Sequence, residues 1–384
     1  MLLAIALVAA ACSSTAATAT DQETPPTTPS ETVEVDVAGE TEELVEAEAP
    51  DSPDEDALSE DAPSEDAPSE DAPAEDDDAD DEASALTDGS LAVGAAIPEG
   101  IPALLHPAYA PDAPRAFNGR VIPVSVDNAA DAAELFTEVE RALRVDGLSD
   151  EAYADLGHTE QLIVRTLIRN EDWIPEFLAD VPEDLRPFAE LHILARQELG
   201  RHVGDAPLGE NVPPWEIIEP VAMDELVTFY KEAGSATGID WEVLAGVNLV
   251  ETVIGRINGV SSAGAQGPMQ FLPTTWPEVS QGGDVLDPED AINGAARYLV
   301  QRGGLENIND GLWGYNNSFE YGNAVLAYAD LLRLDEDAFR GFYNWEVYVG
   351  SVEGTLWLPV GLNLEERIPA AEYLAQNPWA TTLG

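Results

Sequence analysis

The sequence is poor in basic residues. Its 384 residues include 16 lysines and arginines against 75 aspartates and glutamates, and the formal net charge is −59. Lys231 is the single lysine. Nucleic-acid binding needs basic side chains to neutralise phosphates, and adsorption to anionic lipid needs clusters of the same residues. The composition therefore excludes nucleic acid as a partner and excludes a basic membrane-binding surface.

Cysteine and the common metal-binding motifs are also scarce. Cys12 is the only cysteine, so no disulfide forms within the chain. There is no His-Glu-x-x-His segment, no EF-hand loop and no glycine-rich phosphate loop. The four histidines are scattered instead of lying at ligand spacing: His106, His158, His192 and His202. We therefore expect no metal site and no cofactor.

No apolar run is long enough to span a bilayer. The ten residues from Leu2 to Ala11 fit the hydrophobic part of a signal peptide, which we assign to residues 1–11. Small residues stand directly before Cys12 and serines follow it, a pattern that resembles the lipobox of bacterial lipoproteins. The resemblance implies a lipid on Cys12, and ordinary secretion with a chance cysteine is the alternative.

Residues 12–100 form an acidic segment. Every charged residue up to Asp88 is acidic, and the stretch 58–73 repeats the unit Ser-Glu-Asp-Ala-Pro three times. Such a composition buries too little apolar surface to offset the entropy of ordering the chain, so we predict a disordered tether. The alternative is a solubilising tail that does not act as a spacer for the rest of the protein.

The rest of the chain has helical periodicity, which predicts a mainly α fold. Apolar residues recur at helical spacing behind Asn128, a favourable N-cap, and the pattern continues through 162–167 and 185–199. We assign 101–213 to a helical accessory region without visible chemistry. Residues 214–334 contain further helices, one expected to be capped by Asp240 and another to open at Asp287-Pro288. Residues 335–384 form a C-terminal extension, in which 345–349 and 355–360 predict a small hairpin.

Three separated motifs carry a specific resemblance. Glu251 stands near the end of a predicted helix, Ser261 follows in a loop, the run 264–273 reads Gly-Ala-Gln-Gly-Pro-Met-Gln-Phe-Leu-Pro, and Gly-Tyr-Asn stands at 314–316. Over about 223–332 the chain resembles the lytic transglycosylase domain with the goose-type lysozyme fold. It departs from the family pattern by one extra residue between Glu251 and Ser261 and by Pro268 in place of leucine.

The resemblance implies a site centred on Glu251. Partial burial and the negative end of a helix dipole both disfavour its carboxylate, and a raised pKa suits a general acid that protonates a glycosidic oxygen. The family implies substrate contacts from residues of the two later motifs, with the hydroxyl of Tyr315 directed toward the acid. The predicted substrate-binding residues are Ser261, Met269, Gln270, Phe271, Trp276, Tyr315 and Asn316.

The implied activity is non-hydrolytic cleavage of the MurNAc–GlcNAc β-1,4 bond of peptidoglycan, leaving 1,6-anhydro ends. A muramidase that hydrolyses the same bond is the alternative, and it would need a second carboxylate to hold water. The candidates for that carboxylate are Asp240, Asp284, Asp287 and Glu320. A non-enzymatic wall-binding lipoprotein is disfavoured because the motif residues are intact. We expect an exported protein that binds glycan strands, either in the cell wall or held on the outer face of the cytoplasmic membrane by a lipid on Cys12.

Overall fold

Helices dominate the part of the chain that the computed structural model describes, residues 114–123 and 126–381. The mainly α fold predicted from periodicity is therefore confirmed. The predicted signal peptide, Cys12, the acidic tether and the first residues of the accessory region lie outside the described residues. Within the described ranges, no helix is both long enough and apolar enough to cross a membrane.

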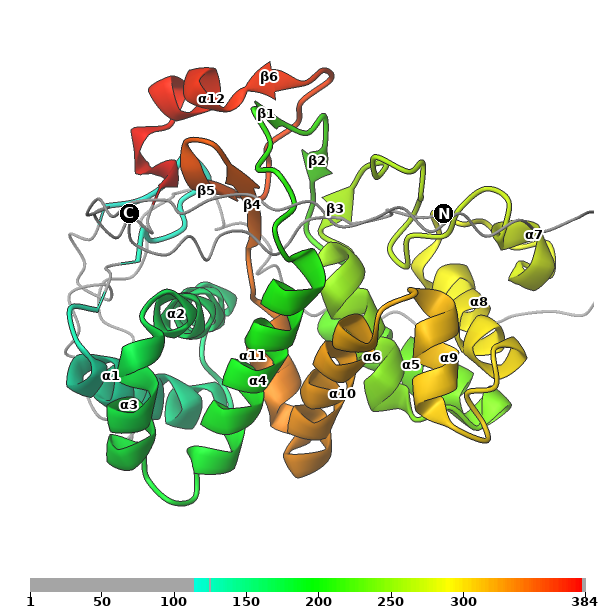
Figure 1. Ribbon diagram of the computed structural model, residues 1–384, viewed down its shortest axis with the longest axis horizontal. Coiled ribbons are helices and arrows are strands. Elements are labelled where there is room, and N and C mark those ends of the chain that lie inside the picture. Colours follow the sequence, from blue (N-terminus) through cyan, green and yellow to red (C-terminus); the bar gives the residue numbers. More distant parts are fainter. Residues whose placement is uncertain (1–113, 124–125, 382–384) are drawn as a thin grey trace, which may run out of the picture. The chain divides into compact units, whose positions relative to one another are not determined.

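The first four helices come from the predicted accessory region (Figure 1). They are α1 Ala129–Leu143, α2 Asp150–Arg169, α3 Ile174–Asp180 and α4 Arg186–Val203. The side chain of Asn128 accepts a hydrogen bond from the backbone N–H of Asp131, so the predicted N-cap of α1 is confirmed. Pro187 stands at the start of α4, where its missing N–H leaves no helical bond unmade.

Eight more helices follow along the described chain (Figure 1). They are α5 Met223–Thr237, α6 Trp241–Thr252, α7 Trp276–Val279, α8 Pro288–Gln301, α9 Ile308–Tyr315, α10 Phe319–Leu334, α11 Phe339–Tyr343 and α12 Ala370–Gln376. Helix α8 begins at Pro288, as predicted, and Asp287 caps it by accepting from the N–H of Asp290. Asp240 stands at the N-cap of α6 but makes no capping bond; its carboxylate instead accepts from Arg333 Nη2 at 2.8 Å, so the predicted side-chain cap is wrong.

The described strands pair two by two in antiparallel fashion. Strand β1 Asn211–Val212 pairs with β6 Ile368–Pro369, and β2 Glu216–Ile217 pairs with β3 Ile257–Asn258. The third pair, β4 Val347–Ser351 with β5 Gly354–Leu358, is the hairpin predicted in the C-terminal extension. The β1–β6 pair joins the segment after α4 to the segment before α12.

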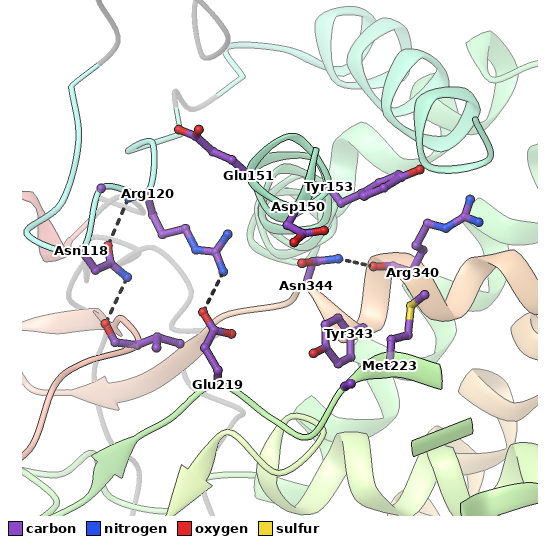
Figure 2. Close-up of a pocket in the computed structure, with 13 residues that line it drawn as sticks. Asn118, Arg120, Asp150, Glu151, Tyr153, Glu219, Met223, Arg340, Tyr343 and Asn344 are labelled. Carbon is purple, nitrogen blue, oxygen red and sulfur yellow. Dashed lines mark hydrogen bonds and ion pairs between the residues drawn. The ribbon is translucent and has the colours of Figure 1, made fainter. Parts of the chain in front are cut away.

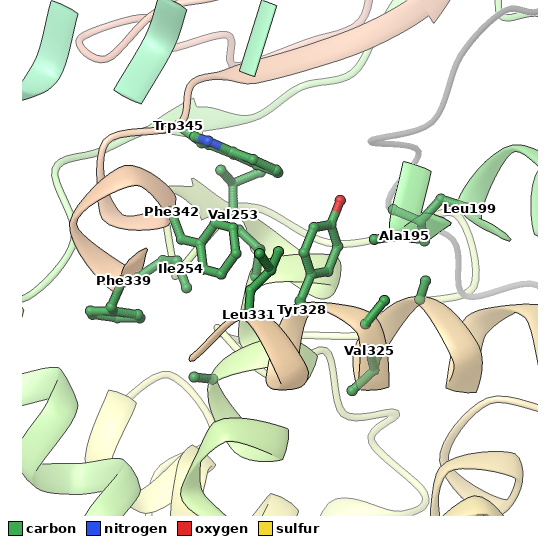
Figure 3. Close-up of a cluster of buried hydrophobic side chains, with 14 of the residues drawn as sticks. Ala195, Leu199, Val253, Ile254, Val325, Tyr328, Leu331, Phe339, Phe342 and Trp345 are labelled. Carbon is green, nitrogen blue, oxygen red and sulfur yellow. The ribbon is translucent and has the colours of Figure 1, made fainter. Parts of the chain in front are cut away.

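Helix α10 lies between α4 and α6 (Figure 1). Ala195 and Leu199 of α4 lie in the same cluster of buried side chains as Val325 and Tyr328 of α10 (Figure 3). The hydrophobic core thus continues across the 213/214 boundary that separates the proposed accessory and catalytic segments.

The crossing of α6 and α10 depends on a close backbone approach at Gly246. A Cβ atom there would lie 2.8 Å from the carbonyl oxygen of Val325, so only glycine lets the helices come this near. The approach brings the end of α6, with Glu251, to the start of α10, with Tyr321.

Candidate active site

Glu251 is a buried carboxyl group in the last turn of α6. Its exposed fraction is 7%, and its Oε1 accepts a 2.7 Å hydrogen bond from the hydroxyl of Tyr321. Burial raises the pKa of Glu251 to about 8, against the smaller lowering effect of the Tyr321 hydrogen bond. The side chain therefore holds a proton at neutral pH, as a general acid must.

Helix α6 ends directly after Glu251 in a left-handed turn. Val253 has φ 54°, Ile254 has φ 60° and Gly255 has φ 81°. Helix α6 therefore ends at Thr252. Left-handed φ costs β-branched residues on the order of 1–3 kcal/mol each, so surrounding contacts must hold this turn.

One such contact is the side chain of Thr252. Its Oγ1 accepts from the N–H of Gly255 at 3.0 Å and donates to the carbonyl oxygen of Pro268 at 2.6 Å. The same carbonyl accepts from Asn248 Nδ2 at 2.8 Å, and Asn248 Oδ1 in turn accepts from the Tyr230 hydroxyl at 2.6 Å. This buried polar network fastens the loop around Pro268 to the helix that carries Glu251.

The loop presents Gln270 beside the acid. Gln270 has φ 50° and donates from Nε2 to the carbonyl oxygen of Gly267 at 2.9 Å. Gly267 has φ 72°, and a Cβ there would lie 1.9 Å from the carbonyl oxygen of Val285. Glycine is thus required at 267 both for its conformation and for the close approach of the neighbouring segment.

A cleft of about 250 Å³ opens over Glu251. It brings together four of the predicted substrate-binding residues from two separate motifs: Gln270, Phe271, Tyr315 and Asn316. Its other lining residues are Leu272, Thr275, Tyr298, Gly314 and Asn317. Amide, hydroxyl and aromatic groups around one buried acid are suited to a sugar, which offers hydroxyl and amide groups on its edges and C–H groups on its faces.

The other three predicted substrate-binding residues do not line this cleft. Met269 is fully buried, and Ser261 Oγ accepts from the N–H groups of Ala263 and Ala265, which closes a turn. Trp276 packs on Phe271 with ring centroids 5.2 Å apart. In the described chain these residues support the loop that carries Gln270 and Phe271.

Tyr321, and not Tyr315, donates to the carboxyl group of Glu251. The resemblance predicted that Tyr315 would point its hydroxyl at Glu251, but this hydroxyl donates to the carbonyl oxygen of Met269 at 2.7 Å. The two tyrosine rings stack with an interplanar angle of 7° and centroids 6.4 Å apart. Ser318 caps α10 and so sets Tyr321 in the first helical turn, a local signal that did not identify its distant partner.

No second carboxylate among the described residues lines the cleft. Of the four candidates, Asp240 pairs with Arg333. Asp284 accepts from the N–H of Leu286, and Asp287 caps α8. The carboxylate of Glu320 accepts from the Ser318 hydroxyl at 2.8 Å. The described cleft therefore holds a single acidic group.

A larger cavity of about 710 Å³ lies elsewhere, beside the start of α2 and α11 (Figure 2). Arg120 points to Glu219 across it and pairs with that carboxylate at 3.3 Å, and Arg340 pairs with Asp146 at 2.8 Å. Of its carboxylates, Asp150 and Glu219 are exposed and Glu151 is half-buried, whereas Glu251 is buried. The smaller cleft is thus the better candidate for acid chemistry.

Comparison with known proteins yields one short match. The chain is 36% identical over 72 residues to the membrane-bound lytic murein transglycosylase F of Ectopseudomonas mendocina (strain ymp). The match covers 19% of this chain and 14% of the relative, so most of the relative's length has no counterpart in it. No family model matches the chain, and no solved structure matches it.

Proposed function

We propose that this protein is a peptidoglycan lytic transglycosylase that cleaves the MurNAc–GlcNAc β-1,4 bond without water. The observation that carries the proposal is the buried Glu251, whose pKa burial raises to about 8, in a cleft that contains no second carboxylate among its described lining residues. The short match to a named lytic murein transglycosylase agrees with it.

In the proposed reaction Glu251 first gives its proton to the glycosidic oxygen, and the bond between that oxygen and C1 of MurNAc breaks. The carboxylate then takes the proton from the C6 hydroxyl of the same sugar, whose oxygen forms a bond to C1. The products are a free GlcNAc hydroxyl and a 1,6-anhydro ring. Glu251 ends the cycle protonated. The reaction therefore consumes no water and needs no second carboxylate.

The neighbouring residues have distinct proposed roles. Tyr321 stabilises the carboxylate that forms between the two proton transfers, because a hydroxyl donor favours the charged form. Gln270 and Asn316 line the cleft, and their amides are suited to the N-acetyl and hydroxyl groups of the substrate. Tyr315 offers ring surface to the sugar, and the buried Phe271 packs against the Tyr315 ring. Ser261, Met269 and Trp276 hold the loop in place.

The deciding experiment is mass analysis of products from purified peptidoglycan. Transglycosylase products are lighter than hydrolytic products by one water per cut, and their MurNAc ends resist borohydride reduction. Reducible MurNAc ends as the main product would replace the proposal with the muramidase alternative. An absence of both kinds of product would favour the non-enzymatic wall-binding protein.

We also propose that the protein is exported and anchored through a lipid on Cys12, with residues 12–100 as a tether for the body. Residues 214–334 would then carry the chemistry, flanked by the accessory region 101–213 and the extension 335–384. Cys12→Ser should release the protein from the membrane fraction into the medium. Continued membrane association of that variant would contradict the lipid anchor.

A further inference from the structure

A second cluster of buried ionisable groups lies outside the cleft. Glu140 of α1, Glu160 of α2 and His192 of α4 meet with exposed fractions of 1%, 2% and 1%. None of them lines the Glu251 cleft. One ligand atom from each lies within 4.8 Å of the other two. The cluster therefore joins three helices that are separated along the sequence.

The imidazole lies between the two carboxylates without a direct hydrogen bond to either. His192 Nε2 is 3.6 Å from Glu140 Oε1 and 3.7 Å from Glu160 Oε1. A direct N–H···O bond would bring these atoms to about 2.7–3.2 Å. The separation instead suits two atoms that bind the same metal ion. Two ligand atoms that each lie about 2.1 Å from a zinc ion and are 3.6 Å apart form an angle of about 120° at the ion.

The outer oxygen of each carboxylate is held in place by a neighbour. Arg144 Nη1 donates to Glu140 Oε2 at 2.7 Å, and Trp345 Nε1 donates to Glu160 Oε2 at 2.7 Å. The inner oxygen Oε1 of Glu140 has no hydrogen-bond partner among the described residues, although it is buried and directed toward His192. Metal-ligating carboxylates are oriented in this way by groups that bind the oxygen facing away from the ion.

We propose that Glu140, Glu160 and His192 form a structural site for one divalent transition-metal ion, of which zinc suits the ligands best. Two carboxylate oxygens and one imidazole nitrogen are donors that zinc accepts, and a fourth position remains for water or another oxygen. The ion fastens α1, α2 and α4 together, and α4 packs on α10, which carries Tyr321.

The charges of the cluster favour a cation at this point. Arg144 supplies one positive charge for two carboxylates. A divalent ion between the inner oxygens would offset both the burial and the mutual repulsion.

The test uses the full chain, unfolded and refolded in parallel with EDTA or with ZnCl₂, then passed over a chelating resin to remove loosely held zinc. We expect one zinc per chain and a melting temperature several degrees above that of the metal-free protein. His192→Ala should lose the zinc, whereas His202→Gln, which changes a histidine outside the cluster, should keep it.

The Glu160→Gln variant distinguishes a metal site from a pair of carboxyl groups that share one proton. Glutamine has the shape of a protonated carboxylic acid, so a carboxyl pair held by one shared proton would keep its stability in this variant. The metal site instead predicts loss of bound zinc and loss of the zinc-dependent rise in melting temperature. A wild-type chain that retains no zinc, or a Glu160→Gln variant that binds it fully, would overturn the proposal. Neither outcome bears on the Glu251 chemistry.

Discussion

The hydroxyl of Tyr321 donates a 2.7 Å hydrogen bond to Glu251, although the two residues come from helices far apart in the sequence. This contact and the burial of Glu251 act on the pKa of the carboxyl group in opposite directions. It stabilises the carboxylate and so lowers the pKa, while burial raises the pKa to about 8. The balance keeps Glu251 protonated at neutral pH but leaves it able to release the proton during the reaction.

Replacement of the acid should remove activity without unfolding the chain. Glu251→Gln keeps the side-chain volume but cannot give or recover a proton, so we expect turnover on purified peptidoglycan to fall by at least about 100-fold. Glu320→Gln removes a carboxylate that does not line the cleft, and it should retain activity. Normal turnover by Glu251→Gln would exclude this residue as the general acid.

The pH dependence should report the protonation of Glu251. Because the acid must be protonated at the start of the cycle, kcat/KM should fall as pH rises through about 8. Tyr321→Phe removes the hydrogen bond that favours the carboxylate, so the alkaline limb should move to higher pH. Initial rates on soluble glycan fragments across the pH range measure the alkaline limb of the wild type and that of the Tyr321→Phe variant. A limb that moves to lower pH in the variant would contradict this assignment.

Because its pKa is raised in the fold, ionised Glu251 should destabilise the folded protein at high pH. A carboxyl whose pKa is 4.5 when unfolded and about 8 when folded stabilises the fold below 4.5, and this contribution is lost as pH rises toward 8. Each unit corresponds to about 1.4 kcal/mol, so at neutral pH Glu251→Gln should be more stable than wild type by on the order of 3 kcal/mol. Denaturant unfolding at pH 4 and pH 7 tests this. An unchanged difference between the two pH values would refute a raised pKa.

Substitution by alanine should have unequal effects at Gly264 and Gly267, the two glycines that precede Gln270 in the loop. Gly264 and Gly267 both have positive φ, but a Cβ at 264 meets nothing within 4 Å, whereas one at 267 would lie 1.9 Å from the carbonyl oxygen of Val285. Gly264→Ala should therefore cost only the backbone strain, on the order of 1 kcal/mol. Gly267→Ala should displace the loop, lower the melting temperature more and reduce activity strongly. Equal effects of the two changes would mean that the contact with Val285 does not hold the loop.

Local sequence was sufficient to predict much of the fold. The N-cap Asn128, the start of α8 at Pro288 and the hairpin at 347–358 all follow from residues within a few positions of one another. Helical periodicity alone predicted the mainly α fold. The choice of Glu251 also rests on local information, because its place in the last turn of an apolar helix and the motif that follows it can be read along the chain.

Contacts between distant segments were decided only in the tertiary structure. Tyr321 replaces Tyr315 as the donor to Glu251, because the Gly246 approach brings the start of α10 to the end of α6. Asp240 pairs with Arg333 and gives up its predicted capping role. Glu140, Glu160 and His192 carry no recognisable spacing, and only the packing of α1, α2 and α4 brings them together. Periodicity states which face of a helix is buried, but the partner of each buried polar group depends on how the helices cross.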